Sequence, residues 1–470
     1  MATSGQAASP GVLSEAVIRR FGTALDGEIV RPGEPSYDVR RKVFNGMIDR
    51  RPALIVRPAN ARAVQTCVSF ARECGLLVSV KGGGHSVPGH AVCDEGLMID
   101  LSLLKAIRVD PEARVAFAEG GVCWGEFDAA TQQHGLAVTG GRVRSTGIAG
   151  LTLGSGSGWL ERKLGYTVDS LTGADVVTAG GELLHASERE NADLFWGLRG
   201  GGGNFGIVTG FEYRVHPIGP MVYGGMLGFS RHRASDILRR YRDFMEGAPD
   251  DVCGALALVT APPAGFVPQE LQGKPAIAII VCYTGAPAEG EQAMRPILDL
   301  GPAFGELRPL PYEAVQGLLE GSNPPGRRNY WKADMYPHLP DEALERLLAA
   351  TAETASPHTV VLVQPLGGAV HRVPDGATAI GWRQAKWSMH VLGMWVDAAD
   401  DERNTAWVRG VDSSLKPWAQ EGGYLNYLGD EGPKRVEQSF GAHYGRMVAL
   451  KNKYDPTNFF RLNQNIKPAA

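Results

Sequence analysis

The chain of 470 residues has no apolar run near the roughly 20 residues that a membrane-spanning helix needs. Residues 1–20 are small and polar and lack the apolar core of a secretory signal. There is no basic run, and the net charge of −4 argues against nucleic acid or an anionic membrane as the main partner. We therefore expect a soluble, cytoplasmic protein without a membrane or nucleic-acid partner.

Cysteine is scarce, and no two cysteines form a CxxC pair. Because the residues are scattered, we expect most of them to be buried thiols in a reducing compartment. His85, His90 and Cys93 lie close together, but no fourth ligand follows at a matching spacing. We expect no metal, and a metal-dependent hydrolase built on these three side chains is the alternative. The six cysteines are Cys67, Cys74, Cys93, Cys123, Cys253 and Cys282.

Glycine is abundant, with 61 residues, and it is clustered. Residues 52–56 and 77–80 have the pattern of buried strands, with an amphipathic helix expected between them from residue 60. A triple glycine at 82–84 follows the second strand directly. Such a turn lets main-chain N–H groups approach an anion such as a diphosphate, and it would hold His85 beside the ligand.

Further glycines gather at 140–158 and 200–206. Gly201, Gly203 and Gly206 match the GxGxxG pattern of dinucleotide sites. That pattern requires a strand before it and a helix after it, whereas here a helix is expected before and a strand after. We therefore do not expect a nicotinamide site, and we interpret the glycines as allowing the backbone to pass close to a flat or anionic ligand.

The length predicts more than one domain. Near Pro217 the glycine clusters become fewer and apolar strands and amphipathic helices become more frequent. From Tyr424 the chain returns to a segment rich in glycine, asparagine and aromatic residues. We predict one domain over 1–217, a second over 218–423, and a segment over 424–470 that returns to the first.

Several motifs recur in a characteristic order along most of the chain. In this combination the chain resembles the berberine bridge enzyme-like branch of the vanillyl alcohol oxidase/p-cresol methylhydroxylase (PCMH) flavoproteins. The resemblance implies an α+β fold, with a PCMH-type FAD-binding domain and an antiparallel-sheet substrate domain between its two parts. The motifs are Arg51–Ile55, Lys81–Ser86, Gly158–Leu160, Asp193–Trp196, Arg199–Gly206, Tyr424–Tyr427, Tyr454–Phe460 and Asn463–Asn465.

The resemblance also implies that FAD is bound covalently, through its 8α-methyl carbon, to His85. Relatives that attach the flavin twice use a cysteine where this chain has Val143, so we predict a single attachment and a small or medium-sized substrate. The diphosphate and the adjacent flavin would be held by Lys81, Gly82, Gly83, Gly84, Ser86 and Gly89. Further cofactor contacts are expected from Thr146, Gly147, Ile148, Gly150, Gly154, Gly158, Trp159, Asp169, Gly206, Ile207, Val208, Asn463 and Asn465.

The implied activity is that of an FAD-linked oxidase. It would move hydride from a C–H bond of an alcohol, amine, phenol or other natural product to flavin N5, and electrons to molecular oxygen, giving H2O2. The candidate base is Tyr427, although a phenol with a pKa near 10 needs a neighbouring cation to work near neutral pH. His390, on an expected strand over 387–396, is a candidate substrate contact or proton carrier.

Structural roles stay open for both side chains, as a packed aromatic ring for Tyr427 and a buried, hydrogen-bonded imidazole for His390. Two other functions also stay open. One is a flavin dehydrogenase that uses another acceptor, and the other is a flavin-binding protein without catalytic activity. The small-molecule substrate itself has no motif in the sequence, because specificity is set by the second domain.

Overall fold

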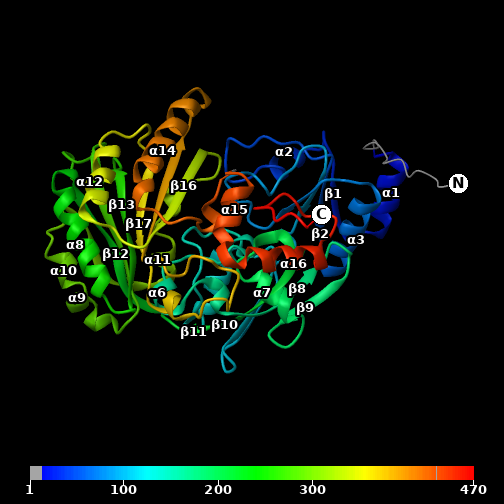
Figure 1. Cartoon of the computed structure of the whole chain (residues 1–470), viewed down its shortest axis with the longest axis horizontal. Coiled ribbons are helices and arrows are strands. Elements are labelled where there is room, and N and C mark those ends of the chain that lie inside the picture. The colour runs from blue at the N-terminus through cyan, green and yellow to red at the C-terminus, as the bar shows by residue number, and fades with distance from the viewer. Residues whose placement is uncertain (1–12, 430, 470) are drawn as a thin grey trace.

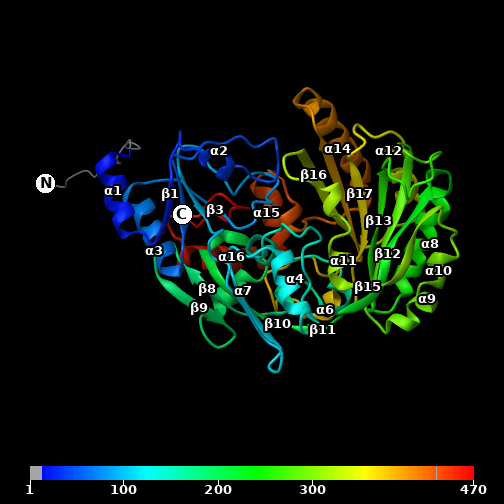
Figure 2. The same cartoon turned by 180° about the vertical axis from the view of Figure 1, so that it is seen from behind.

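The computed structural model describes residues 13–429 and 431–469. Two lobes lie side by side (Figures 1 and 2), and helices and sheets are mixed as the predicted α+β class requires. One lobe contains the N-terminal half of the chain together with its C-terminal end, and the other contains a large sheet within residues 221–395. The predicted domain boundaries near residues 217 and 423 stay predictions.

A four-stranded sheet in the order β1-β2-β4-β3 carries the first glycine turn. The strands β2, β4 and β3 run parallel, and α3 connects β2 to β3, which confirms the predicted strand–helix–strand unit. Asn60 starts α3 by accepting a hydrogen bond from the N–H of Ala63. The elements are β1 (Gly27–Val30), β2 (Leu54–Pro58), α3 (Ala61–Glu73), β3 (Val78–Lys81) and β4 (Leu97–Asp100).

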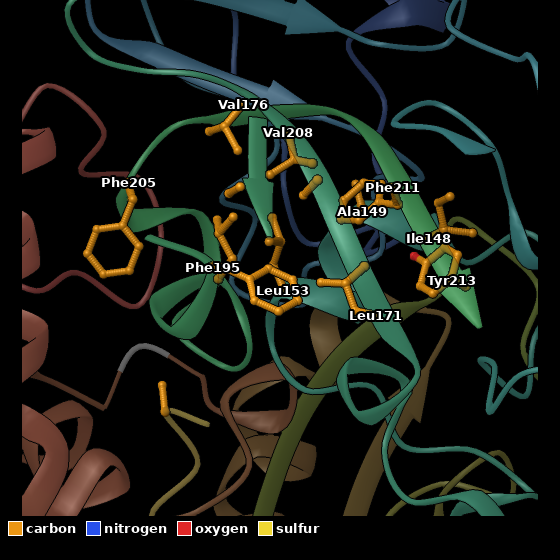
Figure 3. Packing of buried hydrophobic residues seen from close by; sticks show 14 of the residues in the cluster. Ile148, Ala149, Leu153, Leu171, Val176, Phe195, Phe205, Val208, Phe211 and Tyr213 are labelled. Atoms are coloured by element: carbon orange, nitrogen blue, oxygen red, sulfur yellow. The ribbon is translucent and has the colours of Figure 1, made fainter. Parts of the chain in front are cut away.

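A five-stranded antiparallel sheet in the order β5-β6-β10-β8-β9 forms the rest of this lobe. Figure 3 shows its core, in which Phe211 and Tyr213 of β10 lie near Ile148 and Ala149 of α5. The elements are β5 (Ile107–Asp110), β6 (Val115–Glu119), α5 (Ile148–Leu153), β8 (Leu171–Val177), β9 (Leu183–Ser187), α7 (Ala192–Leu198) and β10 (Ile207–Arg214).

The C-terminal helices α15 (Pro433–Phe440) and α16 (Tyr444–Tyr454) complete the same core. Lys451 and Asp455 form an ion pair with no exposed side-chain surface. The Lys451 ammonium also donates to the carbonyl of Asn204, at 2.9 Å, which ties α16 to the third glycine cluster. A buried charge must be paired in this way, so the end of the chain is fixed against the N-terminal lobe.

A seven-stranded antiparallel sheet in the order β15-β12-β14-β13-β17-β18-β16 forms the second lobe. The helices α8 (Ala234–Gly247), α12 (Asp341–Ala350) and α14 (Asp401–Leu415) cover one face. The strands are β12 (Met221–Ser230), β13 (Val252–Thr260), β14 (Pro275–Tyr283), β15 (Phe304–Pro311), β16 (Arg328–Tyr336), β17 (Val360–Pro365) and β18 (Trp387–Trp395).

The alternation of side chains along β18 decides which residues face the other lobe. Met389 and Val391 belong to the core beneath the covering helices. His390 and Leu392 point to the opposite face, where they line a cavity between the lobes. The period-two prediction for the strand around His390 is confirmed.

Shorter elements connect these sheets, and within the described residues no helix is long and apolar enough to span a membrane. Two of the connecting elements, η2 and η8, lie beside the cavity. The shorter connecting elements are α1 (Glu15–Ala24), α2 (Tyr37–Arg40), α4 (Trp124–Gln132), β7 (Leu136–Ala137), α6 (Glu161–Leu164), η2 (Gly202–Asn204), β11 (His216–Pro217), α9 (Gly290–Ala293), α10 (Arg295–Leu298), α11 (Tyr312–Gln316), α13 (Ala369–Arg372) and η8 (Leu425–Tyr427).

Candidate active site

A cavity of about 360 Å³ lies between the lobes. One part of its wall is the loop after β3, the segment around the start of α5, and the start of β10. The opposite part comes from β16, β17 and β18, and η8 with the tail at 460–464 closes it. The glycine-rich loops and one face of the large sheet therefore line the same cavity.

The first two glycine clusters meet backbone to backbone in the cavity wall. A Cβ atom on Gly83 would lie 2.1 Å from the nitrogen of Gly147, and one on Gly147 would lie 2.2 Å from the nitrogen of Gly83. Gly84 also has φ of +73°, a conformation that favours glycine. These contacts explain why the turn before His85 consists of glycine.

His85 follows this turn, is half-buried and faces the cavity. Its ring stacks on Phe44, with centroids 4.4 Å apart, and its Nε2 lies 3.0 Å from Oγ of Ser145. Burial lowers the pKa of His85 to about 4. The imidazole is therefore neutral near neutral pH and keeps the lone pair that a nucleophile needs.

Tyr427 lies in η8 and lines the same cavity. Its ring stacks on His390, with centroids 3.9 Å apart, and meets Tyr424 edge to face. The Tyr427 hydroxyl accepts a hydrogen bond from Nη1 of Arg142 at 3.4 Å. Burial raises the pKa of Tyr427 above its ordinary value, while the positive charge of Arg142 opposes that rise.

Arg142 belongs to a buried polar network that the sequence analysis did not identify. Its Nη2 donates to the carbonyl of Gly158 at 3.0 Å and lies 3.4 Å from Oε1 of Glu161. Glu161 accepts from the hydroxyl of Ser157 at 2.5 Å and from the amide of Gln364 at 3.1 Å. No local motif marks this set, because the network joins a loop and the start of α6 in one lobe to β17 of the other.

His390 faces the cavity from β18 and also meets the Trp331 ring edge to face, with centroids 5.0 Å apart. Burial and the charge of Arg142 lower the pKa of His390 to about 3. Its Nε2 is buried and has no hydrogen-bond partner among residues 13–429 and 431–469. A neutral ring nitrogen aimed at the cavity is available to a bound molecule.

The remaining wall on the side of the large sheet is mostly apolar. Trp331, Leu362 and Leu392 come from three neighbouring strands, and Leu319 and Asn323 come from the segment after α11. With His390 neutral and Arg142 paired with Glu161, this side of the cavity suits an uncharged molecule with a flat or apolar body.

Comparison with known proteins identifies the family. Residues 52–187 match the model of an FAD binding domain, and residues 423–467 match a model described as berberine and berberine like. The chain is 30% identical over 458 residues to an uncharacterized FAD-linked oxidoreductase, YgaK, of Bacillus subtilis strain 168, covering 95% of this chain and 98% of that protein. The chain belongs to the berberine bridge enzyme-like family of FAD-linked oxidoreductases.

A second relative within this berberine bridge enzyme-like family is the (R)-6-hydroxynicotine oxidase of Paenarthrobacter nicotinovorans. It is 28% identical over 467 residues, covering 95% of this chain and 97% of the relative. The crystal structure of 6-hydroxy-D-nicotine oxidase from Arthrobacter nicotinovorans superposes with a TM-score of 0.84 at 27% identity, covering 95% of this chain and 98% of that one. The resemblance and the PCMH-type fold predicted from the sequence are confirmed.

The cavity fits the FAD that this berberine bridge enzyme-like family binds. The facing glycines leave open backbone where side chains would otherwise stand. Asn463 donates to the carbonyl of Gly203 at 3.0 Å, while its Oδ1 is buried without a hydrogen-bond partner in the described part of the chain. Such an acceptor on the cavity wall suits the imide N–H of a flavin.

Of the residues predicted to bind cofactor or substrate, those nearest the glycine turns and on the facing strand line the cavity. The assignment of individual contacts stays a prediction. The lining residues are Gly82, Gly83, Gly84, His85, Ser86, Thr146, Gly147, Gly150, Gly206, Ile207, Val208, His390, Tyr427 and Asn463.

Other predicted contacts lie outside the cavity wall because neighbouring groups hold them. Asp169 pairs with Arg383 at 2.5 Å, and the Lys81 ammonium donates to the carbonyl of Arg40 at 2.8 Å. Trp159 is buried beneath the guanidinium of Arg142. The remaining ones are packed within the surrounding chain: Gly89, Ile148, Gly154, Gly158 and Asn465.

All six cysteines are free thiols, and none of them lines the cavity in the part of the chain that the structure describes. Val143, at the position of the second attachment in some relatives, does line it. Among the described side chains, no group of three or more His, Cys, Asp and Glu is arranged to hold a metal ion.

Proposed function

We propose that this protein is an FAD-dependent oxidase whose flavin is attached covalently through His85 alone. It removes a hydride and a proton from a small organic substrate, and molecular oxygen takes up both as H2O2. The observation that carries this proposal is that His85 and the stacked pair Tyr427 and His390 line the same cavity. The match to the FAD binding domain and the relatives named as oxidases support it.

The protein supplies binding, orientation and proton transfer. FAD, when bound, supplies the hydride acceptor and the path of electrons to oxygen. Tyr427 accepts the proton of the substrate hydroxyl or amine, with Arg142 stabilising the phenolate. His390, which is neutral, orients the same substrate group through its unpartnered Nε2.

Attachment at one site is supported by the residues around the cavity. His85 is neutral, faces the cavity and is oriented by Ser145. Val143 offers no sulfur for a second bond, and no cysteine reaches the wall formed by the described residues.

The substrate that we propose is an uncharged, flat or apolar alcohol, phenol or amine of small or medium size. Trp331, Leu362 and Leu392 would contact its body, since they form the apolar side of the cavity. The absence of an unpaired charge among the described residues on that side argues against a strongly ionic substrate.

The test is anaerobic reduction of the yellow protein by a panel of such donors, followed by exposure to air. An oxidase loses the flavin absorbance with the correct donor and regains it in air, with one H2O2 formed for each product. If the reduced protein persists in air and is reoxidised only by an artificial acceptor, it is a dehydrogenase. If no donor reduces it, the catalytic proposal is wrong.

A further inference from the structure

We propose that Arg142 is a positioning residue that holds the Tyr427 hydroxyl and favours its phenolate, and that Glu161 sets the strength of this effect. The inference rests on the proposed function only in that Tyr427 is taken there as the base. The arrangement of the three side chains is itself a property of the folded protein.

The Arg142 guanidinium is held rigidly by one short stretch of chain. Nη2 donates to the carbonyl of Gly158 at 3.0 Å and to the hydroxyl of Ser157 at 3.2 Å. The guanidinium also lies over the Trp159 ring, 4.7 Å from its centroid. Because these contacts fix the planar group, Nη1 stays directed at the Tyr427 hydroxyl.

In the contact with Tyr427, an N–H of the Arg142 guanidinium, which always carries a positive charge, donates to the phenolic oxygen. At 3.4 Å it is long for a neutral phenol. Removing the phenolic proton adds a negative charge to that oxygen, which strengthens and shortens the hydrogen bond. Arg142 therefore stabilises the phenolate more than the phenol, which is what a base requires.

Glu161 has the opposite effect to Arg142 on the phenolate of Tyr427. Its carboxylate is buried, lies 3.4 Å from Nη2 of Arg142, and is held by Ser157 and Gln364. Its negative charge disfavours a second negative charge on Tyr427, whereas the charge of Arg142 favours it. Removing one charge should thus have the opposite effect to removing the other.

The other groups that face Tyr427 carry no charge near neutral pH. His390, stacked on the ring, is neutral because its pKa is lowered to about 3. The Tyr424 hydroxyl accepts from the N–H of Ser157 and the amide of Asn426, and burial keeps that hydroxyl protonated. Among the described residues, Arg142 and Glu161 therefore dominate the electrostatics of Tyr427.

The experiment titrates Tyr427 in the FAD-loaded protein by its near-ultraviolet tyrosinate absorbance, with the Tyr427→Phe spectrum subtracted. Arg142→Gln should raise the midpoint by about one pH unit or more, and Glu161→Gln should lower it by a similar amount. Arg142→Lys keeps the charge and should restore part of the effect.

Arg162→Gln is the matched control, because Arg162 is equally buried but donates to main-chain carbonyls of the other lobe and does not line the cavity. It should leave the Tyr427 midpoint unchanged. The proposal is overturned if Arg142→Gln and Glu161→Gln move the midpoint in the same direction, or if both leave it unmoved.

The pH dependence of anaerobic flavin reduction separates this inference from the proposed function. If Tyr427 is the base, the rise in rate with pH should shift upward in Arg142→Gln and downward in Glu161→Gln. If the tyrosinate midpoints shift in opposite directions and the rates do not follow, the electrostatic inference holds and the role of Tyr427 as base is wrong.

Discussion

The imidazole of His390 lies against the ring of Tyr427, with 3.9 Å between centroids and an angle of 22° between planes. His390 comes from the large sheet and Tyr427 from the C-terminal segment, so the stack joins the two lobes inside the cavity. A substrate that reaches either group must therefore meet both. The two side chains should act as one unit in binding and proton transfer.

Tyr427→Phe keeps the ring and removes the hydroxyl. We expect the rate of anaerobic flavin reduction to fall about 10²- to 10⁴-fold, because general-base assistance is lost. The FAD content should be unchanged. Stopped-flow absorbance measures the rate, and Tyr330→Phe in β16, outside the cavity wall, is the control. A fall of less than about tenfold would assign the proton transfer to another group.

Titration of His390 should not change the reaction rate at pH values near the ordinary histidine pKa. Burial and Arg142 lower its pKa to about 3, so the ring stays neutral throughout the range from about pH 5 to pH 9. His390→Asn should raise KM about tenfold by removing the ring that orients the substrate, without shifting the profile. Steady-state kinetics across that range measures both, and a limb near pH 6.5 that the variant removes would contradict the neutral assignment.

Asp128 should make stability depend on pH. It is buried between α4 and α11, one oxygen accepts from the Gln316 amide, and burial raises its pKa to about 7. The folded state therefore binds this proton more tightly than the unfolded state. The stabilisation is complete below about pH 4 and is lost as the pH rises through 7.

Asp128→Asn removes that titration and keeps the shape of the side chain. We expect the variant to be more stable than the wild type by about 1 kcal/mol or more at about pH 8, so that it unfolds at a higher temperature there. The difference in stability should be smaller at about pH 5. Calorimetry measures this, with the exposed Glu34→Gln as the control. An equal effect of Asp128→Asn at both pH values would refute the linkage.

Gly83→Ala should separate the two glycine loops, because its Cβ would lie 2.1 Å from the nitrogen of Gly147. Backbone on both sides leaves no flexible side chain to move aside. We expect the FAD content of the purified protein to fall severalfold, measured by absorbance. A Cβ atom on Gly410 in α14 would have no atom within 4 Å of it, so Gly410→Ala should keep a full complement of FAD. Normal loading of Gly83→Ala would contradict the close packing.

The local features of the site could be predicted from the sequence. The strand before the triple glycine, the position of His85 after it and the alternation around His390 each follow from residues adjacent in the chain. Each depends on a short-range rule, either the period of a strand or the conformational freedom of glycine.

The polar network could not be predicted, because its members come from distant parts of the chain. Glu161, which pairs with Arg142, meets Gln364 only when β17 packs against the other lobe. Asp169 lies outside the cavity for a similar reason, since it pairs with Arg383, which is distant in sequence and lies between β17 and β18. Pairing of side chains between lobes leaves no periodic signal in either segment.

The most direct test of the whole account is the mass of the purified chain after acid precipitation. We predict one FAD per chain retained as a covalent adduct, lost entirely in His85→Ala and reduced in Ser145→Ala, which removes the hydroxyl that orients the imidazole. A wild-type chain whose mass shows no adduct, with all its flavin released into the supernatant, would contradict the account.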